Sequence, residues 1–296
     1  MDPWRDIEAA IRESSGAPFA IESRAGIGGG CINECYVVRG RGHAYFVKLN
    51  APDRLSMFEA EAAGLDEIAR SNTVCVPRTL CHGAGAGASW LVLEHIELGP
   101  ASGRGMKELG RRLAAMHRVT APRVGWHRDN TIGATPQTNT PGADWIAFWR
   151  QHRLGFQLRL ASENGHRGRL LTQGERLLEQ LPVFFSGYEP RPSLLHGDLW
   201  SGNAAFMRDG TPVIFDPAVY YGDREADIAM TELFGGFPAE FYRAYDEADA
   251  RDPGYATRKQ LYNLYHVLNH LNLFGGGYRA QAERMIGELL AAAQNA

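Results

Sequence analysis

Two segments of this sequence, residues 194–203 and residues 213–216, carry the side chains with the clearest chemical potential. Asp198 is followed five residues later by Asn203, and Asp216 ends an apolar run thirteen residues after Asn203. Phosphoryl transfer from ATP needs one carboxylate to orient the attacking hydroxyl and accept its proton, while an amide oxygen and a second carboxylate hold Mg²⁺. The spacing therefore predicts Asp198 as the catalytic base, with Asn203 and Asp216 as magnesium ligands.

A purely structural reading of these residues stays open. The His-Gly-Asp sequence could form a tight turn and Asn203 a cap, and Asp216 could end a strand, because a residue before proline favours extended geometry. The rest of the chain favours phosphoryl transfer, since it supplies further parts of a nucleotide site in a consistent order.

The first of these parts is a glycine-rich segment near the N-terminus. Gly28, Gly29 and Gly30 permit a tight turn and a close backbone approach to an anion. The residues that follow, 35–38 and 44–49, have the composition of two strands joined by a turn. A dinucleotide-binding fingerprint needs a helix after its glycines, so this order disfavours an NAD-dependent oxidoreductase and fits a hairpin that covers ATP.

Lys48, in the second of these strands, is expected to contact the α and β phosphates of ATP. Such a lysine needs a carboxylate partner, and residues 57–69 have the pattern of an amphipathic helix with two candidates, Glu59 and Glu61. We expect Glu61 to be the partner, because Leu65 lies four residues beyond it on the apolar face.

Two further apolar runs, residues 74–77 and 90–96, are expected to complete a small antiparallel sheet. Glu94, His95 and Ile96 would then form a hinge at which backbone groups bind the adenine of ATP.

From residue 104 the sequence changes to helical patterns, which predicts an N-terminal lobe over residues 1–96 and a C-terminal lobe over residues 97–296. The stretch 125–142 is rich in Gly, Pro, Thr and Asn and is expected to be an ordered functional loop or an insertion. Asp227, in a helix that begins near residue 223, is expected to be a buried carboxylate that supports the catalytic loop. The other expected helices cover residues 1–15, 106–117, 145–160, 172–181, 258–274 and 278–293.

Composition places the chain among ordinary globular proteins. It has 296 residues, of which 44% are hydrophobic and 22% charged, and a net charge of −3 gives no reason to expect a nucleic-acid or anionic-membrane partner. No run approaches the roughly 18 apolar residues of a membrane span, and no basic segment leads into an apolar one at the start, so we expect a cytoplasmic protein. The four cysteines lack the spacing of a zinc or redox site and are expected to be reduced thiols.

Together the motifs resemble the fructosamine kinase, or ketosamine-3-kinase, family over nearly the whole chain. Trp200 and the closing Asn-His-x-Asn-x-Phe-Gly sequence separate this family from its relatives, the aminoglycoside and choline kinases. The resemblance lies in residues 28–34, 46–48, 57–61, 195–203, 214–218, 234–237 and 268–278.

The resemblance implies an α+β, two-lobed protein-kinase-like fold, with a small antiparallel sheet in the N-lobe and a mainly helical C-lobe. It implies ATP and Mg²⁺ as cofactors and phosphorylation of the 3-hydroxyl of a ketosamine, the rearranged adduct of a sugar with an amine. The phosphorylated adduct is unstable, so the reaction would reverse glycation. Neither the sugar nor the choice between free and protein-bound ketoamines follows from the sequence.

Several residues are candidates for substrate binding within this interpretation. Trp200 could stack on the sugar or anchor the catalytic loop. Asn269, His270 and Asn272 could line the pocket or form a buried hydrogen-bond network. Asp223 is a candidate for contact with the cationic amine of a ketosamine.

In some members of the family, the cysteine of the glycine-rich loop forms a regulatory intermolecular disulfide. Cys31 matches that position, which makes it a candidate redox switch in a disulfide-linked homodimer, and an unpaired thiol in a monomer is the equal alternative. A kinase of another small alcohol or aminoglycoside is the competing function. A pseudokinase is disfavoured because Lys48, Asp198, Asn203 and Asp216 are all present.

Overall fold

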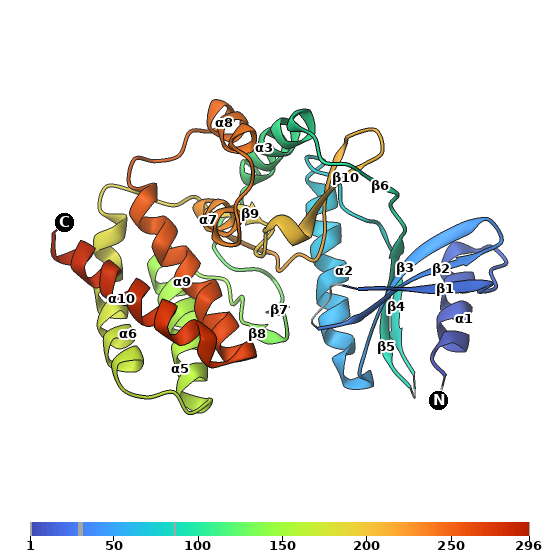
Figure 1. Ribbon diagram of the computed structural model, residues 1–296, viewed down its shortest axis with the longest axis horizontal. Coiled ribbons are helices and arrows are strands. Elements are labelled where there is room, and N and C mark those ends of the chain that lie inside the picture. Colours follow the sequence, from blue (N-terminus) through green and yellow to red (C-terminus); the bar gives the residue numbers. More distant parts are fainter. Residues whose placement is uncertain (1, 29–31, 86, 296) are drawn as a thin grey trace.

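The N-terminal part of the chain forms an antiparallel sheet of five strands in the order β1-β2-β3-β5-β4 (Figure 1). We describe residues 2–28, 32–85 and 87–295 of the computed structural model. The five strands are β1 (Ser23–Ile27), β2 (Glu34–Gly40), β3 (His43–Asn50), β4 (Thr79–Ala84) and β5 (Ser89–Glu94).

A helix covers each face of this sheet: α1 (Trp4–Ser15) lies on one face and α2 (Leu55–Arg70) on the other (Figure 1). Side chains alternate along a strand, so Val47 and Leu49 of β3 share the cluster that contains Ile7 and Ile11 of α1. Lys48 lies between them and points to the α2 face instead. Its position in the strand therefore decides which helix can supply its partner.

The C-terminal part is mainly helical, with three small antiparallel sheets among the helices (Figure 1). Its helices are α3 (Gly103–His117), α4 (Trp145–Phe148), a π-helical segment η2 (Trp149–Leu154), α5 (Gly155–Glu163), α6 (Arg169–Gln180), α7 (Glu225–Leu233), α8 (Ala239–Ala248), α9 (Tyr255–Phe274) and α10 (Arg279–Gln294). Short 3₁₀ turns lie at η3 (Leu181–Phe185), η4 (Ser201–Asn203) and η5 (Gly276–Tyr278), and a further one, η1 (Pro52–Arg54), precedes α2 in the N-terminal part. Its strands are β6 (Leu98–Gly99), β7 (Asn130–Ile132), β8 (Thr135–Gln137), β9 (Ser193–Leu195), β10 (Ala204–Met207), β11 (Pro212–Ile214) and β12 (Tyr220–Gly222).

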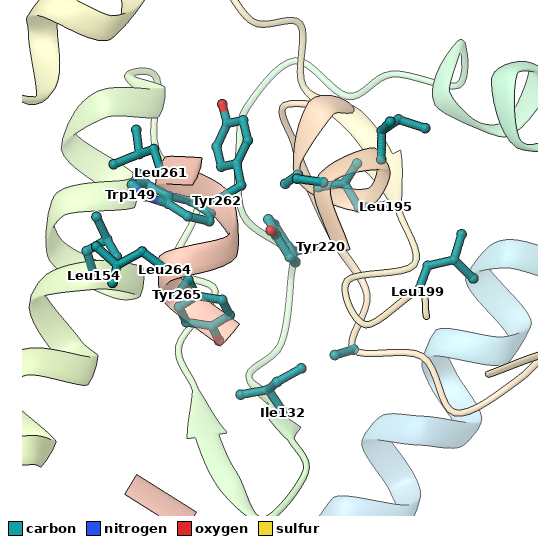
Figure 2. Packing of buried hydrophobic residues seen from close by; sticks show 14 of the residues in the cluster. Ile132, Trp149, Leu154, Leu195, Leu199, Tyr220, Leu261, Tyr262, Leu264 and Tyr265 are labelled. Atoms are coloured by element: carbon teal, nitrogen blue, oxygen red, sulfur yellow. The ribbon is translucent and has the colours of Figure 1, made fainter. Parts of the chain in front are cut away.

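The core of this part is unusually aromatic and centres on α9 (Figure 2). Tyr262 packs edge-on against Trp149, with ring centroids 4.9 Å apart. Tyr220 of β12 pairs with Leu195 of β9, so the strand that leads to the catalytic loop is anchored in this core. Figure 2 shows these side chains converging from helices and strands that are far apart in sequence.

The expected α+β, two-lobed architecture is confirmed, but one local expectation was wrong. Residues 74–77 form no strand of the five-stranded sheet: Cys75 makes an isolated bridge to Val213, Pro77 has no N–H to donate, and β4 begins only at Thr79. The stretch 125–142, expected to be an ordered functional loop or an insertion, contains the paired strands β7 and β8. In the described part of the chain, no helix is long and apolar enough to cross a membrane.

Candidate active site

The catalytic loop follows β9 and is held by hydrogen bonds to its backbone. Asp227 of α7 accepts from the backbone N–H groups of His196 at 2.7 Å and Gly197 at 2.8 Å. Its Oδ2 also lies 3.1 Å from Nε2 of His117, at the end of α3. The expectation that Asp227 is a buried support of the loop is confirmed, and His117 is a partner that sequence reasoning missed.

Gly197 must be a glycine for two reasons. Its φ is +83°, in the left-handed region, and a Cβ there would lie 2.1 Å from the carbonyl oxygen of Ala218. The chain therefore turns sharply at Gly197, between His196, whose backbone N–H is held by Asp227, and the half-buried Asp198.

Asp198 lies beside Asn203, whose Nδ2 donates to the backbone oxygen of Asp198 at 2.8 Å. The pKa of Asp198 is raised to about 7, chiefly by burial and further by the charges of Asp216 and Asp227, while the hydrogen bond from Asn203 lowers it. Because the amide nitrogen of Asn203 is engaged, its oxygen is the atom left to act as a ligand.

Lys48 is 3% exposed and bridges two carboxylates. Its Nζ lies 2.6 Å from Oε1 of Glu61 on α2 and 2.5 Å from Oδ1 of Asp216. Burial would lower the pKa of Lys48, but Asp216 and Glu61 outweigh it and raise the pKa above its ordinary value, so the ammonium stays charged. The structure thus pairs Lys48 with Glu61, as expected, whereas Glu59 forms an ion pair with Arg128.

A cleft of about 870 Å³ brings these groups together. Lys48 and Glu61 line it from the N-terminal part, and Asp198, Asn203 and Asp216 line it from the C-terminal part. The cleft is large enough for a small-molecule substrate beside a nucleotide's phosphates.

The donor set fits Mg²⁺ shared with a nucleotide. In the described residues, no group of three or more His, Cys, Asp or Glu side chains could hold a metal ion by itself. Mg²⁺ in phosphoryl-transfer sites is held by one or two carboxylates together with substrate phosphates and water, so a small protein donor set is expected. Asp216 has 46% of its side chain exposed, which leaves a carboxylate oxygen accessible, and Asn203 lines the same cleft.

Three of the predicted substrate residues, Trp200, Asn269 and His270, line the cleft. Asn269 also belongs to a buried network, because its Oδ1 accepts from Nε2 of Gln157 at 3.1 Å. The cleft has further lining residues that sequence reasoning missed, namely Asn130, Thr131, Ile132, Gly133, Phe234, His266, Phe274 and Tyr278. The Gly, Thr and Asn content of stretch 125–142 is the signal that points to the first four.

Neither Asp223 nor Asn272 lines the cleft. The expected contact of Asp223 with the substrate amine is therefore wrong, whereas for Asn272 the alternative of a hydrogen-bond network is confirmed. Asp223 is 1% exposed and accepts from the hydroxyls of Tyr188 at 2.9 Å and Tyr262 at 2.5 Å. Asn272 donates through Nδ2 to Oε1 of Gln157 at 2.8 Å. Both residues are satisfied by the protein and have structural roles.

The predicted nucleotide-binding segments are placed only in part. Gly28 lines the cleft, whereas Gly29, Gly30 and Cys31 lie outside the described residues. Glu94 ends β5, and residues 94–96 are not among the described residues that line the cleft. The roles of the glycines and the hinge, the redox role of Cys31 and a disulfide-linked dimer therefore stay predictions.

Comparison with known proteins shows the family of this chain. A family model described as fructosamine kinase matches residues 3–292. A protein of Synechocystis named as a probable ketoamine kinase is 47% identical over 97% of each chain. A chloroplastic protein-ribulosamine 3-kinase of Oryza sativa subsp. indica is 44% identical over 94% of this chain and 81% of its own.

Solved structures show the same architecture. A structure from Haemophilus somnus assigned as a fructosamine-3-kinase has a TM-score of 0.89 and 29% identity over 97% of each chain. An aminoglycoside phosphotransferase, at 13% identity, has a TM-score of 0.64 over 97% of this chain and 98% of its own. The fold is therefore that of the protein-kinase-like phosphotransferases. Within that class, the chain belongs to the fructosamine kinase family.

Proposed function

We propose that this protein transfers the γ-phosphoryl group of ATP to the 3-hydroxyl of a ketosamine, a fructosamine or a ribulosamine. The observation that carries the proposal is the half-buried Asp198 in one cleft with the Lys48–Glu61–Asp216 ion pairs. Relatives named as ketoamine kinase and protein-ribulosamine 3-kinase, each more than 40% identical, support the choice of substrate.

In this mechanism the protein positions two reactants and stabilises charge. Asp198 accepts the proton of the attacking hydroxyl, and its raised pKa suits that role near neutral pH. Lys48 contacts the phosphates and is held in place by Glu61. Asn203 and Asp216 would hold Mg²⁺, which supplies positive charge to the phosphates when it is bound.

The nucleotide is proposed to lie under Gly28, Gly29 and Gly30, with its adenine at Glu94, His95 and Ile96. Trp200, Asn269 and His270 are proposed to contact the sugar-bearing substrate. Release of the amine from the unstable 3-phosphate would make the protein a deglycation enzyme acting on free or protein-bound ketoamines, and a cytoplasmic location stays a prediction.

A substrate panel with Asp198→Asn as the control tests the proposal. ATP consumption with Mg²⁺ is measured on fructosamines, ribulosamines, choline and an aminoglycoside. We expect turnover on the ketosamines, and a loss of at least about 100-fold in kcat for Asp198→Asn with ATP affinity retained, as is typical for removal of a general base.

The other outcomes separate the competing functions. Turnover only on choline or the aminoglycoside would keep the phosphotransferase site and discard the ketosamine substrate. Near-normal turnover of Asp198→Asn would overturn Asp198 as the base.

A further inference from the structure

Four rings of the C-terminal part form a group at the cleft that has no part in the phosphoryl-transfer step itself. They are Phe234, which ends α7, His270 and Phe274 on α9, and Tyr278 in η5, and we call them the His270 cluster. The His270 ring centroid lies 4.8 Å from that of Phe234, 5.5 Å from Phe274 and 5.2 Å from Tyr278. All four residues line the cleft.

The hydrogen bond of His270 fixes which of its nitrogens is free. Nδ1 lies 2.8 Å from the backbone oxygen of His266, and a carbonyl oxygen only accepts, so Nδ1 carries the proton. The neutral ring then has a lone pair on Nε2. Burial lowers the pKa of His270, which favours this neutral form. Nε2 is therefore a hydrogen-bond acceptor among three aromatic rings.

Several large apolar side chains that line the cleft are exposed to solvent, which indicates that they bind a ligand. Phe274 is 52% exposed, Trp200 37% and Ile27 46%, and all three line the cleft. Exposed large apolar side chains that gather around a concavity mark binding sites more often than single scattered ones do.

The distribution of charged side chains in the cleft indicates which chemical group of a ligand can bind to the His270 cluster. The described residues of fixed charge that line the cleft are Lys48, Glu61, Asp198 and Asp216, and none of them belongs to the cluster. A lone-pair acceptor surrounded by rings repels a phosphate. It suits an ammonium N–H, whose positive charge is attracted to aromatic faces, and the alkyl carbons beside it.

We propose that the His270 cluster binds the amine-bearing arm of the ketosamine, with the ammonium N–H donating to Nε2 of His270 and the attached alkyl chain packing on Phe274 and Tyr278. This inference rests on the proposed function. The amine is on C1 of the sugar, two carbons from the reacting C3, so it must lie close to the base. The cluster lines the same cleft as Asp198, and Trp200 of the catalytic loop contacts it, because the ring centroids of Trp200 and Phe234 lie 6.2 Å apart.

Two ligands that differ only in the amine arm test the proposal. One is the fructosamine of a simple alkylamine, measured as a substrate, and the other is 1-deoxyfructose, which lacks the nitrogen and is measured by its competition with the fructosamine. We expect His270→Phe, which keeps a ring but loses the acceptor, to raise KM for the fructosamine about 10- to 100-fold. KM for ATP and the inhibition constant of 1-deoxyfructose should change less than about threefold. His270→Gln, whose amide oxygen can replace Nε2, should retain most of the affinity.

Phe274→Ala is a second test variant, and it should leave the fold intact because the ring is half exposed. We expect KM for the fructosamine to rise about 3- to 10-fold, with kcat nearly unchanged. Leu98→Ala is the matched control, since Leu98 is 53% exposed and lies away from the cleft.

Three results would overturn the inference while leaving the proposed function intact. They are wild-type KM values in both His270 variants, equal weakening of fructosamine and 1-deoxyfructose in His270→Phe, and equal effects of Phe274→Ala and Leu98→Ala. If the unmodified enzyme turned over no ketosamine at all, the proposed function would fall first and the inference with it.

Discussion

Asp227 shows how one buried carboxylate sets both the geometry and the acid stability of this protein. Burial alone would raise the pKa of Asp227, but hydrogen bonds and charges from His117, His196 and Gly197 hold the pKa below its ordinary value. A group whose pKa is lower in the folded than in the unfolded chain stabilises the fold above its ordinary pKa of about 4. That contribution is lost as the pH falls through the lowered value.

We therefore predict that Asp227→Asn lowers the free energy of unfolding by about 2–4 kcal/mol at pH 7, because charged acceptors of backbone N–H groups are lost. The difference from the unmodified protein should shrink as the pH falls below about 4. Urea unfolding between about pH 3 and pH 7 measures it. Asp66→Asn, on the exposed side of α2, is the control, and a difference that stays constant with pH would contradict the prediction.

Residues whose partners are near in sequence were predictable, and residues whose partners are remote were not. Glu61 could be chosen over Glu59 because helical periodicity fixes the face of α2 that meets Lys48. Asp223 was misplaced because its two tyrosine partners lie 35 and 39 residues away, and no local pattern reports their hydroxyls. The identity of Asp198 followed from motif spacing, whereas the support by His117, 110 residues from Asp227, followed from the fold alone.

At the scale of elements, the turn between β9 and the catalytic loop depends on Gly197. Gly187 is a matched comparison, because its φ of +74° is also left-handed but no atom lies within 4 Å of where its Cβ would be. We predict that Gly187→Ala costs about 1–2 kcal/mol of stability, the ordinary penalty for this conformation. Gly197→Ala should cost more than that and lower kcat at least about tenfold, because Ala218 must move and Asp198 with it.

Thermal unfolding and steady-state kinetics of the two variants measure the difference. Equal losses in stability and activity would mean that backbone conformation alone, rather than contact with Ala218, sets the requirement at position 197.

The elements themselves were predicted well where a periodic pattern was strong. The pattern at residues 57–69 matches α2 (Leu55–Arg70), and the pattern at 258–274 matches α9 (Tyr255–Phe274). The short hairpin of β7 and β8 was not predicted, because three-residue strands rich in Thr, Pro and Asn show no alternation of apolar and polar side chains. The four cleft residues at 130–133 lie in the stretch that was predicted to be functional, but no local pattern singled them out individually.

Across the whole molecule, α2 connects the sheet to the helical part. Its Gly64 packs against Val219, and its Glu67 accepts from the hydroxyl of Tyr221 at 2.7 Å. The Lys48–Asp216 ion pair joins the same two parts inside the cleft. Bound nucleotide and Mg²⁺ would interact with both members of this ion pair, since Lys48 is proposed to contact phosphate and Asp216 is proposed to bind the metal. We therefore expect ligand binding to be coupled to the contact between the two parts.

This coupling predicts a thermal shift that depends on the metal and on Asp216. A ligand at about 100 times its Kd stabilises the folded state by about 2.7 kcal/mol, which raises Tm by about 5 °C in a protein of this size. We expect a non-hydrolysable ATP analogue with Mg²⁺ to give a shift of that order, and the analogue with a chelator to give less than about half of it. Asp216→Asn should lose the metal-dependent part.

Asp198→Asn is the control in the same assay, because it removes a charge from the cleft without removing a proposed metal ligand, and it should keep the metal-dependent shift. Differential scanning fluorimetry at several analogue concentrations separates a weaker Kd from a change in intrinsic Tm. Equal shifts with and without Mg²⁺ in the unmodified protein would remove Asn203 and Asp216 from the metal site, because their proposed role requires that the ion strengthen nucleotide binding through the C-terminal part of the cleft.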